Sequence, residues 1–219
     1  MKIVFKYTSK SRPVRFFEGL DSIVNNLSNS NDYYIQCTFD LSDSSMNNDE
    51  VKKRLHTYKN LVYYFGASES KIDAINKNLD KLTNDWDILV NFSDDQKFLV
   101  HGFDDTIRND MPEDLDWFIH YPDSHTKDKI PTMSIMGVNY FKRTNRIYHP
   151  DFKNVYCDNY AMQEAKVLNR YVFIDKTIFE HYHPIWRLAE WDEQYRKTES
   201  TYAEDRQTYL NLMKQNFNQ

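Results

Sequence analysis

Apolar and polar positions follow two alternating patterns through the first half of the chain. Short apolar runs predict β-strands over residues 2–7, 33–39, 61–65 and 87–92. Apolar residues at helical spacing predict helices over residues 15–27, 51–58, 71–82 and 96–108. Because strands alternate with helices in this way in βαβ units, this half is predicted to form a mainly parallel sheet flanked by helices.

The second half has shorter and less regular runs. They predict strands over residues 117–121 and 171–173, an extended segment over 178–183, a short helix or turn after 132–138, and helices over 160–168 and 199–217. No repeat and no low-complexity linker separates the halves. We therefore expect one domain over residues 1–219, in which residues 96–219 complete a site begun by residues 1–95.

Composition narrows the class of protein. The chain has 219 residues, a net charge of −5 and 16% aromatic residues, which favours a packed core over disorder. Two cysteines and no apolar stretch long enough for a membrane span predict a cytoplasmic protein. The four glycines form no phosphate-binding loop, which excludes Rossmann dehydrogenases and P-loop NTPases. The acidic balance argues against non-specific binding of nucleic acid.

Polar residues follow each predicted strand of the first half. Ligands of parallel sheets bind outside the carboxyl ends of the strands. Arg12 follows the first strand, Asp40 ends the second, and Lys71 follows the third, with Asn76 further along the same predicted helix. Arg12, Lys71 and Asn76 are candidates to contact a phosphate or a base, although exposed basic side chains are more often only solvated.

The fourth strand runs into Ser93, Asp94 and Asp95. Adjacent carboxylates at a strand end suit Mg²⁺ or Mn²⁺, which prefer oxygen ligands and commonly bind together with substrate phosphates. The same residues also suit an ordinary helix cap.

Two features of the second half are also candidates. His181 and His183 share one face of an extended segment, because side chains alternate along a strand, so both can ligate one metal ion. Asp158 lies just before a predicted helix, where it suits either an N-cap or a general base.

Taken in order, these segments resemble nucleotide-sugar glycosyltransferases of the GT-A fold, of the family 2-like kind. Residues 1–13 are similar to that family's first strand and loop, residues 70–79 to its helix before the acidic motif, and residues 87–95 to its strand and Asp-x-Asp motif. Residues 130–137, 148–158, 180–184 and 205–217 resemble its acceptor segment, the approach to its catalytic acid, its late histidine segment and its terminal helix.

The resemblance implies an α/β, GT-A type fold with a Rossmann-like sheet and a smaller acceptor-side half. It implies a UDP- or GDP-linked sugar donor, Mn²⁺ or Mg²⁺ as cofactor, and a hydroxyl acceptor such as a glycan, a lipid-linked sugar, a protein or a modified nucleic acid. The roles it implies are a catalytic base at Asp158, donor contacts at Thr8, Arg12, Asp40, Lys71, Asn76 and Asp94, and metal contacts at Asp95, His181 and His183.

Two positions depart from the family pattern. Phe92 occupies the first position of a strict Asp-x-Asp motif, and Cys157 replaces the Glu of the usual Glu-Asp pair. Of the two histidines, we favour His181 as the metal contact.

Two functions are alternatives to a glycosyltransferase. One is a zinc-dependent hydrolase that uses His181 and His183, and the other is a non-catalytic binding module of the same fold.

Overall fold

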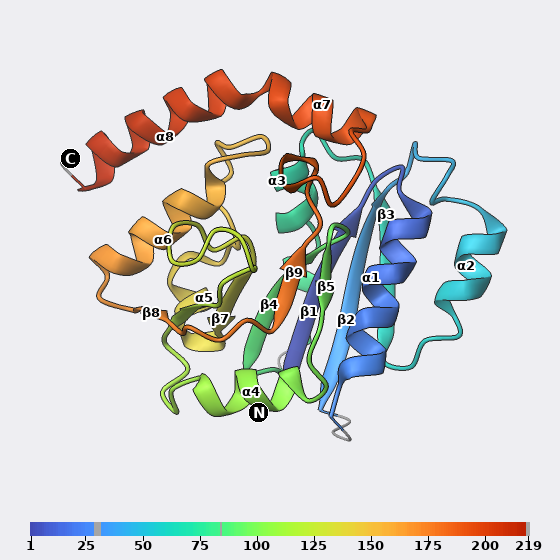
Figure 1. Ribbon diagram of the computed structural model, residues 1–219, viewed down its shortest axis with the longest axis horizontal. Coiled ribbons are helices and arrows are strands. Elements are labelled where there is room, and N and C mark those ends of the chain that lie inside the picture. The colour runs from blue at the N-terminus through green and yellow to red at the C-terminus, as the bar shows by residue number, and fades with distance from the viewer. Residues whose placement is uncertain (29–31, 84, 218–219) are drawn as a thin grey trace.

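The computed structural model describes residues 1–28, 32–83 and 85–217. A seven-stranded sheet runs through the middle of the molecule in the order β3-β2-β1-β4-β7-β6-β8 (Figure 1). Its strands are β1 (Ile3–Ser9), β2 (Tyr33–Asp40), β3 (Leu61–Gly66), β4 (Ile88–Ser93), β6 (Phe118–His120), β7 (Ser134–Gly137) and β8 (Tyr171–Phe173). A second sheet pairs β5 (Gln96–Phe98) with β9 (Phe179–His181) in antiparallel fashion.

The four strands of the first half are parallel, as the sequence predicts. In register, Thr8 pairs with Thr38 on one side and with Ser93 on the other, and Asp40 pairs with Gly66. The carboxyl ends of β1, β2, β3 and β4 therefore lie side by side. The predicted α/β class with a mainly parallel sheet is confirmed, while β7 joins β4 in the antiparallel direction.

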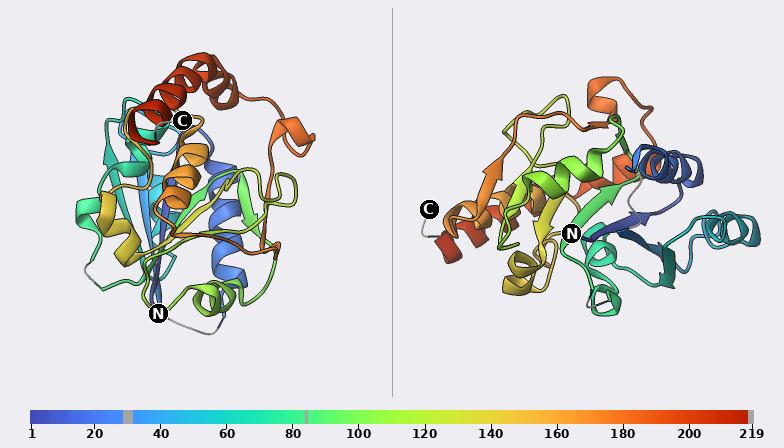
Figure 2. Two further views of the ribbon diagram at one scale, coloured as in Figure 1. Left: turned by 90° about the vertical axis from the view of Figure 1, so that its left-hand side faces the viewer. Right: turned by 90° about the horizontal axis from the view of Figure 1, so that it is seen from below.

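Helices cover both faces of the sheet (Figure 2). One face carries α1 (Pro13–Asn26), α2 (Asp49–Leu55) and α4 (Phe103–Asp110), and the other carries α3 (Lys71–Asn76), α5 (Val138–Thr144), α6 (Cys157–Val167) and α8 (Tyr202–Phe217). The remaining elements are α7 (Glu193–Ser200) and two 3-10 turns, η1 (Leu79–Lys81) and η2 (Pro184–Trp186).

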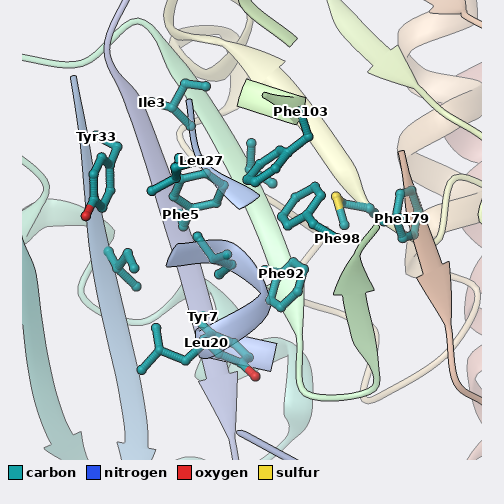
Figure 3. Close-up of a cluster of buried hydrophobic side chains, with 14 of the residues drawn as sticks. Ile3, Phe5, Tyr7, Leu20, Leu27, Tyr33, Phe92, Phe98, Phe103 and Phe179 are labelled. Carbon is teal, nitrogen blue, oxygen red and sulfur yellow. The ribbon is translucent and has the colours of Figure 1, made fainter. Parts of the chain in front are cut away.

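Alternating side chains of the strands divide between two cores. Phe5 and Phe92 pack with α1 on one face, and Phe98 stacks on Phe103 next to them (Figure 3). Val4 and Leu89 point to the other face and pack with α3 and α6. Many of the aromatic residues are therefore part of the two cores, where their large rings bury apolar surface.

Two helices of the first half differ from the prediction. The helix expected over residues 71–82 ends at Asn76, because the backbone of Lys77 is extended (ψ 144°). Asn78 then adopts a left-handed backbone (φ 60°), and its carbonyl accepts a hydrogen bond from Gln36. The helix expected over residues 96–108 is wrong in its first part. Residues Gln96–Phe98 form β5, which pairs with β9, and α4 begins only after Gly102, whose φ of 77° suits glycine.

Elements of the second half are displaced by a few residues. The segment 132–138 contains strand β7, and the short helix expected after it is α5. The terminal helix is two helices, α7 and α8, separated at Thr201. Helix α6 begins at Cys157, so Asp158 lies in its first turn and is not its N-cap. None of the helices in the described part of the chain has the length and apolar content that a bilayer crossing requires.

Candidate active site

A cavity of about 560 Å³ opens where β1, β2 and β4 end. Nine of the ten residues singled out from the sequence line it, namely Thr8, Arg12, Asp40, Lys71, Asp94, Asp95, Asp158, His181 and His183. They come from elements spread over most of the chain. Helix α7 and the start of α8 form one wall of the cavity, with Gln194, Tyr195, Lys197, Thr198 and Tyr202.

Asp94 is held from two sides. Its Oδ2 accepts a hydrogen bond from Ser9 Oγ (2.6 Å), and its Oδ1 accepts one from Arg12 Nη1 (2.9 Å). Burial raises the pKa of Asp94, against the opposing charge of Arg12. Arg12 also makes a bidentate pair with Asp192, with both nitrogen–oxygen distances at 2.7 Å. Both oxygens of Asp94 are therefore engaged by protein donors.

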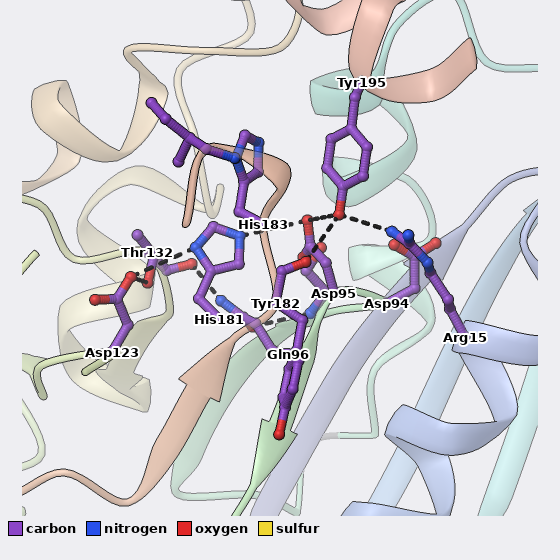
Figure 4. A network of polar contacts seen from close by, with 12 residues as sticks. Arg15, Asp94, Asp95, Gln96, Asp123, Thr132, His181, Tyr182, His183 and Tyr195 are labelled. Atoms are coloured by element: carbon purple, nitrogen blue, oxygen red, sulfur yellow. Dashed lines mark hydrogen bonds and ion pairs between the residues drawn. The ribbon is translucent and has the colours of Figure 1, made fainter. Parts of the chain in front are cut away.

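Asp95 has a different environment (Figure 4). Its Oδ2 lies 3.3 Å from His181 Nε2 and accepts a 3.3 Å hydrogen bond from the hydroxyl of Tyr195. Its Oδ1 is buried and has no hydrogen-bond partner among the residues that the structure describes. Burial opposes ionisation of Asp95, but the charge and hydrogen bonding of His181, together with the charge of Lys71, lower the pKa of the carboxyl. Asp95 is thus a buried carboxylate with one oxygen left over.

The two histidines are not equivalent. His181 lies between two carboxylates, with Nε2 near Asp95 and Nδ1 3.4 Å from Asp123 Oδ2. Burial favours its neutral form, yet these two charges raise the pKa of His181 to about 9. His183 uses Nδ1 to accept a hydrogen bond from the backbone N–H of Ile185, and burial lowers the pKa of His183 to about 4.

The other end of the cavity is formed by β1, β2 and the start of α3. Asp40 accepts hydrogen bonds from Lys10 Nζ (2.6 Å) and from Ser42 Oγ (2.7 Å). Although burial works against it, these contacts lower the pKa of Asp40 to about 2. Thr8 and Lys71 lie along the same wall. This end therefore combines fixed negative charge at Asp40 with the basic side chains of Lys10 and Lys71.

Asp158 projects into the cavity from the first turn of α6. Tyr156 precedes that helix with a left-handed backbone (φ 62°), a conformation rare for an aromatic residue. Asp158 Oδ1 accepts only the adjacent backbone N–H of Asn159, at 2.8 Å, among the hydrogen bonds of the described residues. Burial raises the pKa of Asp158 above its usual range, which makes the carboxylate a better proton acceptor.

Asn76 is the one singled-out residue that the structure does not bring to the cavity. Its side-chain oxygen accepts from the backbone N–H groups of Ile147 and Tyr148, and its Nδ2 donates to the carbonyl of Tyr148 (2.7 Å). Asn76 therefore fastens α3 to the segment that leads toward Asp158, and its amide oxygen has both acceptor positions engaged there.

Sequence reasoning missed three residues of this network. Tyr195 and Asp192 lie in a stretch with no strong hydrophobic pattern, and Asp123 lies in a polar loop. The sequence did contain one signal for Asp192, because an Asp followed by Glu193 and Gln194 suits a helix N-cap. In the structure Asp192 caps α7 by accepting a hydrogen bond from the backbone N–H of Tyr195 (3.0 Å).

The donor atoms around Asp95 fit a divalent cation. Among residues 1–28, 32–83 and 85–217, no three His, Cys, Asp or Glu side chains form a complete metal site. Mg²⁺ and Mn²⁺ do not require one, because they commonly keep water and take one or two carboxylates plus substrate phosphates. Among the described residues, Oδ1 of Asp95 has no hydrogen-bond partner, and Asp95 lines the cavity, so it is such a carboxylate.

Comparison with known proteins bears on the fold. No family model and no curated protein sequence matches the chain. Solved structures do. One is the mannosyltransferase PcManGT from Pyrobaculum calidifontis in complex with GDP-Man and Mn²⁺, with a TM-score of 0.65, 11% identity, and coverage of 80% of this chain and 55% of that one.

Two further structures share the architecture. S. aureus TarS 1–349 in complex with UDP-GlcNAc has a TM-score of 0.66 at 13% identity, covering 89% of this chain and 61% of that one. The 4-diphosphocytidyl-2C-methyl-D-erythritol synthase from Anaerococcus prevotii has a TM-score of 0.53 at 13% identity, covering 80% and 86%. The chain thus has the GT-A fold and spans little more than half the length of the first two proteins.

Proposed function

We propose that the chain is a metal-dependent glycosyltransferase, which moves a sugar from a UDP- or GDP-linked donor to an acceptor hydroxyl with inversion at the anomeric carbon. The observation that carries this proposal is the convergence of Asp95, His181 and Asp158 on one cavity of a GT-A fold. The proteins of similar fold were solved with GDP-Man and Mn²⁺ or with UDP-GlcNAc.

In this proposal residues 1–95 hold the donor and residues 96–219 hold the acceptor within one domain. Asp40 accepts from the nucleobase, with Thr8 beside it, and Arg12 and Lys71 lie where a diphosphate needs positive charge. Asp94 keeps Arg12 in place through its 2.9 Å contact. The nucleoside end and the phosphate end of the donor are thus bound by different strand ends.

Asp95 with His181 would hold Mn²⁺ or Mg²⁺, which would supply positive charge to neutralise the departing diphosphate. We assign the contact to His181 rather than His183, because the Nδ1 of His183 accepts from Ile185 while Nε2 of His181 already lies against Asp95. The hydroxyl of Tyr195 donates a hydrogen bond to Oδ2 of Asp95, the same oxygen that His181 contacts.

Asp158 acts as the general base. It takes the proton of the acceptor hydroxyl while the new C–O bond forms at the anomeric carbon and the C–O bond to the diphosphate breaks on the opposite face. The raised pKa of Asp158 favours this transfer. The acceptor belongs to a glycan, a lipid-linked sugar, a protein or a modified nucleic acid, and the proposed compartment is the cytoplasm.

Asp158→Asn tests the base. We expect transfer to fall by about 10²- to 10⁴-fold, the usual contribution of a general base. Binding of UDP or GDP with Mn²⁺, measured as a rise in melting temperature, should stay close to that of the wild type. Asp151→Asn, which alters an exposed carboxylate in the same segment outside the cavity, is the control and should retain transfer. Full transfer by Asp158→Asn would overturn the assignment.

The same melting experiment separates the alternatives. Stabilisation by a nucleoside diphosphate only in the presence of Mn²⁺ supports the transferase. Stabilisation by Zn²⁺ alone, with no response to any nucleotide, supports the hydrolase that uses His181 and His183. Nucleotide binding without turnover of any nucleotide sugar supports a binding module.

A further inference from the structure

We propose that Asp205 of α8 is a positioning residue, which holds the backbone of residues 153–155 and thereby fixes the place of Asp158 in the cavity. This inference rests on the proposed function, since it states how the chain orients the general base that acts there. Helix α8 lies across α6 at the end of the sheet where the cavity opens (Figure 1). The proposal gives this helix a part in the reaction.

Asp205 is fully buried, and both of its oxygens accept hydrogen bonds from the backbone of one segment. Oδ1 accepts from the N–H of Lys153 (2.8 Å), and Oδ2 accepts from the N–H groups of Asn154 and Val155 (both 2.9 Å). The hydroxyl of Thr201 lies 3.1 Å from Oδ2. One carboxylate therefore orients three successive peptide groups of a segment that lies about 50 residues earlier in the chain.

This segment lines the cavity and leads directly to Asp158. Asn154 and Val155 are part of the cavity wall. The carbonyl of Lys153 accepts from the backbone N–H of Ile72 (3.2 Å), so the segment is also tied to the first turn of α3. It is thus fixed by α8 on one side and by α3 on the other, and α6, which carries Asp158, begins directly after Tyr156.

The backbone of Tyr156 requires this support. Its left-handed conformation (φ 62°) is unfavourable for an aromatic residue and persists only where the surroundings impose it. The hydroxyls of Tyr156 and Tyr202 lie 2.7 Å apart, and Tyr202 begins α8. Asp158 accepts from the adjacent N–H of Asn159, and no side chain of the described residues donates a hydrogen bond to it. The direction of Asp158 is therefore set by the backbone that Asp205 holds.

Asp205→Asn tests the inference with little change of volume. The new NH₂ group must face at least one backbone N–H that the carboxylate accepted, so two donors oppose each other. Turnover is measured as release of UDP or GDP from UDP- and GDP-linked sugars with Mn²⁺, in which Asp158 takes the proton of water instead of that of an acceptor. We expect turnover to fall about 10²-fold, as for a catalytic group displaced by about 1 Å. The rise in melting temperature with a nucleoside diphosphate and Mn²⁺ should stay that of the wild type.

The decisive comparison combines Asp205→Asn with Asp158→Asn. A residue that acts through Asp158 has nothing to position once that carboxylate is gone, so the double variant should turn over the donor as fast as Asp158→Asn alone. A residue that only stabilised the fold would lower turnover by the same factor in both backgrounds.

Asp104→Asn is the matched control. Asp104 is also fully buried and accepts from the backbone N–H of Ser28 (2.7 Å), but it lies on α4, at the opposite end of the sheet from α8 (Figure 1). The variant should lower the melting temperature and leave turnover and nucleotide binding unchanged.

Three results would overturn the inference alone: wild-type turnover in Asp205→Asn, an equal loss of turnover in Asp104→Asn, or a further loss in the double variant. A wild type that releases no UDP or GDP from any donor would instead overturn the proposed function, and this inference with it. The turnover of the wild type therefore separates the two failures.

Discussion

Asp94 and Asp95 show how far the surroundings of a side chain, rather than its type, set its chemistry. The two carboxylates are adjacent in the chain, and each is 7% exposed. Ser9 and Arg12 occupy both oxygens of Asp94, whereas Asp95 keeps Oδ1 without a partner. Both residues lie at the cavity because they directly follow β4. Only their contacts show that Asp94 orients Arg12, whereas Asp95 has an oxygen available for a ligand.

His120 carries a prediction at the same scale. It is fully buried on β6, with Nδ1 2.7 Å from the hydroxyl of Tyr171. Its Nε2 has no hydrogen-bond partner in the described part of the chain. Burial lowers the pKa of His120 from 6.5 to about 4. Between these values the unfolded chain holds a proton that the folded chain lacks. The free energy of unfolding should therefore decrease as the pH falls from 6.5 to 4, by about 3 kcal/mol from this residue.

His120→Gln removes that titration and keeps a polar side chain. Denaturant unfolding at several pH values between 7 and 4 measures the effect as the difference between wild type and variant, in which the titration of other groups cancels. We expect the difference to change with pH in favour of the variant as the solution becomes more acidic. Parallel stability profiles for the two proteins would show that His120 does not take up a proton on unfolding.

At the scale of elements, Asp192 both caps α7 and connects this helix to the cavity. Asp192 accepts from the backbone N–H of Tyr195 and forms the bidentate pair with Arg12. Arg12 also lies 4.0 Å from the centre of the Tyr195 ring. Helices α7 and α8 lie across the end of the sheet where β1 and β4 finish (Figure 1). Asp192 therefore joins the start of α7 to the candidate donor site.

Asp192→Ala should have two separable effects. Loss of the cap should lower the free energy of unfolding by about 1 kcal/mol. Release of Arg12 and Tyr195 should also weaken binding of a nucleoside diphosphate with Mn²⁺ by about tenfold, in a titration that follows the melting temperature. Asn48→Ala is the control, because Asn48 caps α2 by accepting from Val51 N (2.9 Å) and lies away from the cavity. Equal ligand affinity in the two variants would contradict a role of Asp192 in the site.

For the whole molecule, the two halves share their cores as well as the cavity. Strand β4 of the first half pairs with β7 of the second. The α1 side of the sheet combines Phe5 with Phe179, and the opposite side combines Leu89 with Tyr160. Separating the halves would expose apolar surface on both faces of the sheet, at a cost that grows with its area.

We therefore predict that the chain unfolds in one cooperative transition. Far-UV circular dichroism reports the loss of helices and strands, and tryptophan fluorescence reports on both halves, because buried Trp86 and exposed Trp186 lie in different halves. Both signals should change at the same denaturant concentration. Residues 1–95 alone should not fold, since they lack the partner strand of β4. Two separated transitions would instead indicate halves that fold independently.

Much of this architecture was predictable from local pattern. The four parallel strands and the polar residues at their ends follow from short apolar runs that alternate with helices. The main wrong prediction was the helix over residues 96–98. The local pattern there resembles a helix, and only pairing with β9 makes these residues a strand. The place of Asn76 outside the cavity was not visible in the local pattern, since the backbone of Ile147 and Tyr148 that engages its amide lies about 70 residues away in the chain.

The sequence by itself determined the class of fold, the edge of the sheet where the cavity lies, and most of the side chains that gather there. Hydrophobic periodicity and strand ends are local properties, so they can be read without knowing what packs where. Only the tertiary structure decided the partners. It set His181 between Asp95 and Asp123, joined Arg12 to Asp192, and placed Tyr195 against Asp95. These contacts join residues up to 180 positions apart, and their distances depend on how whole elements pack.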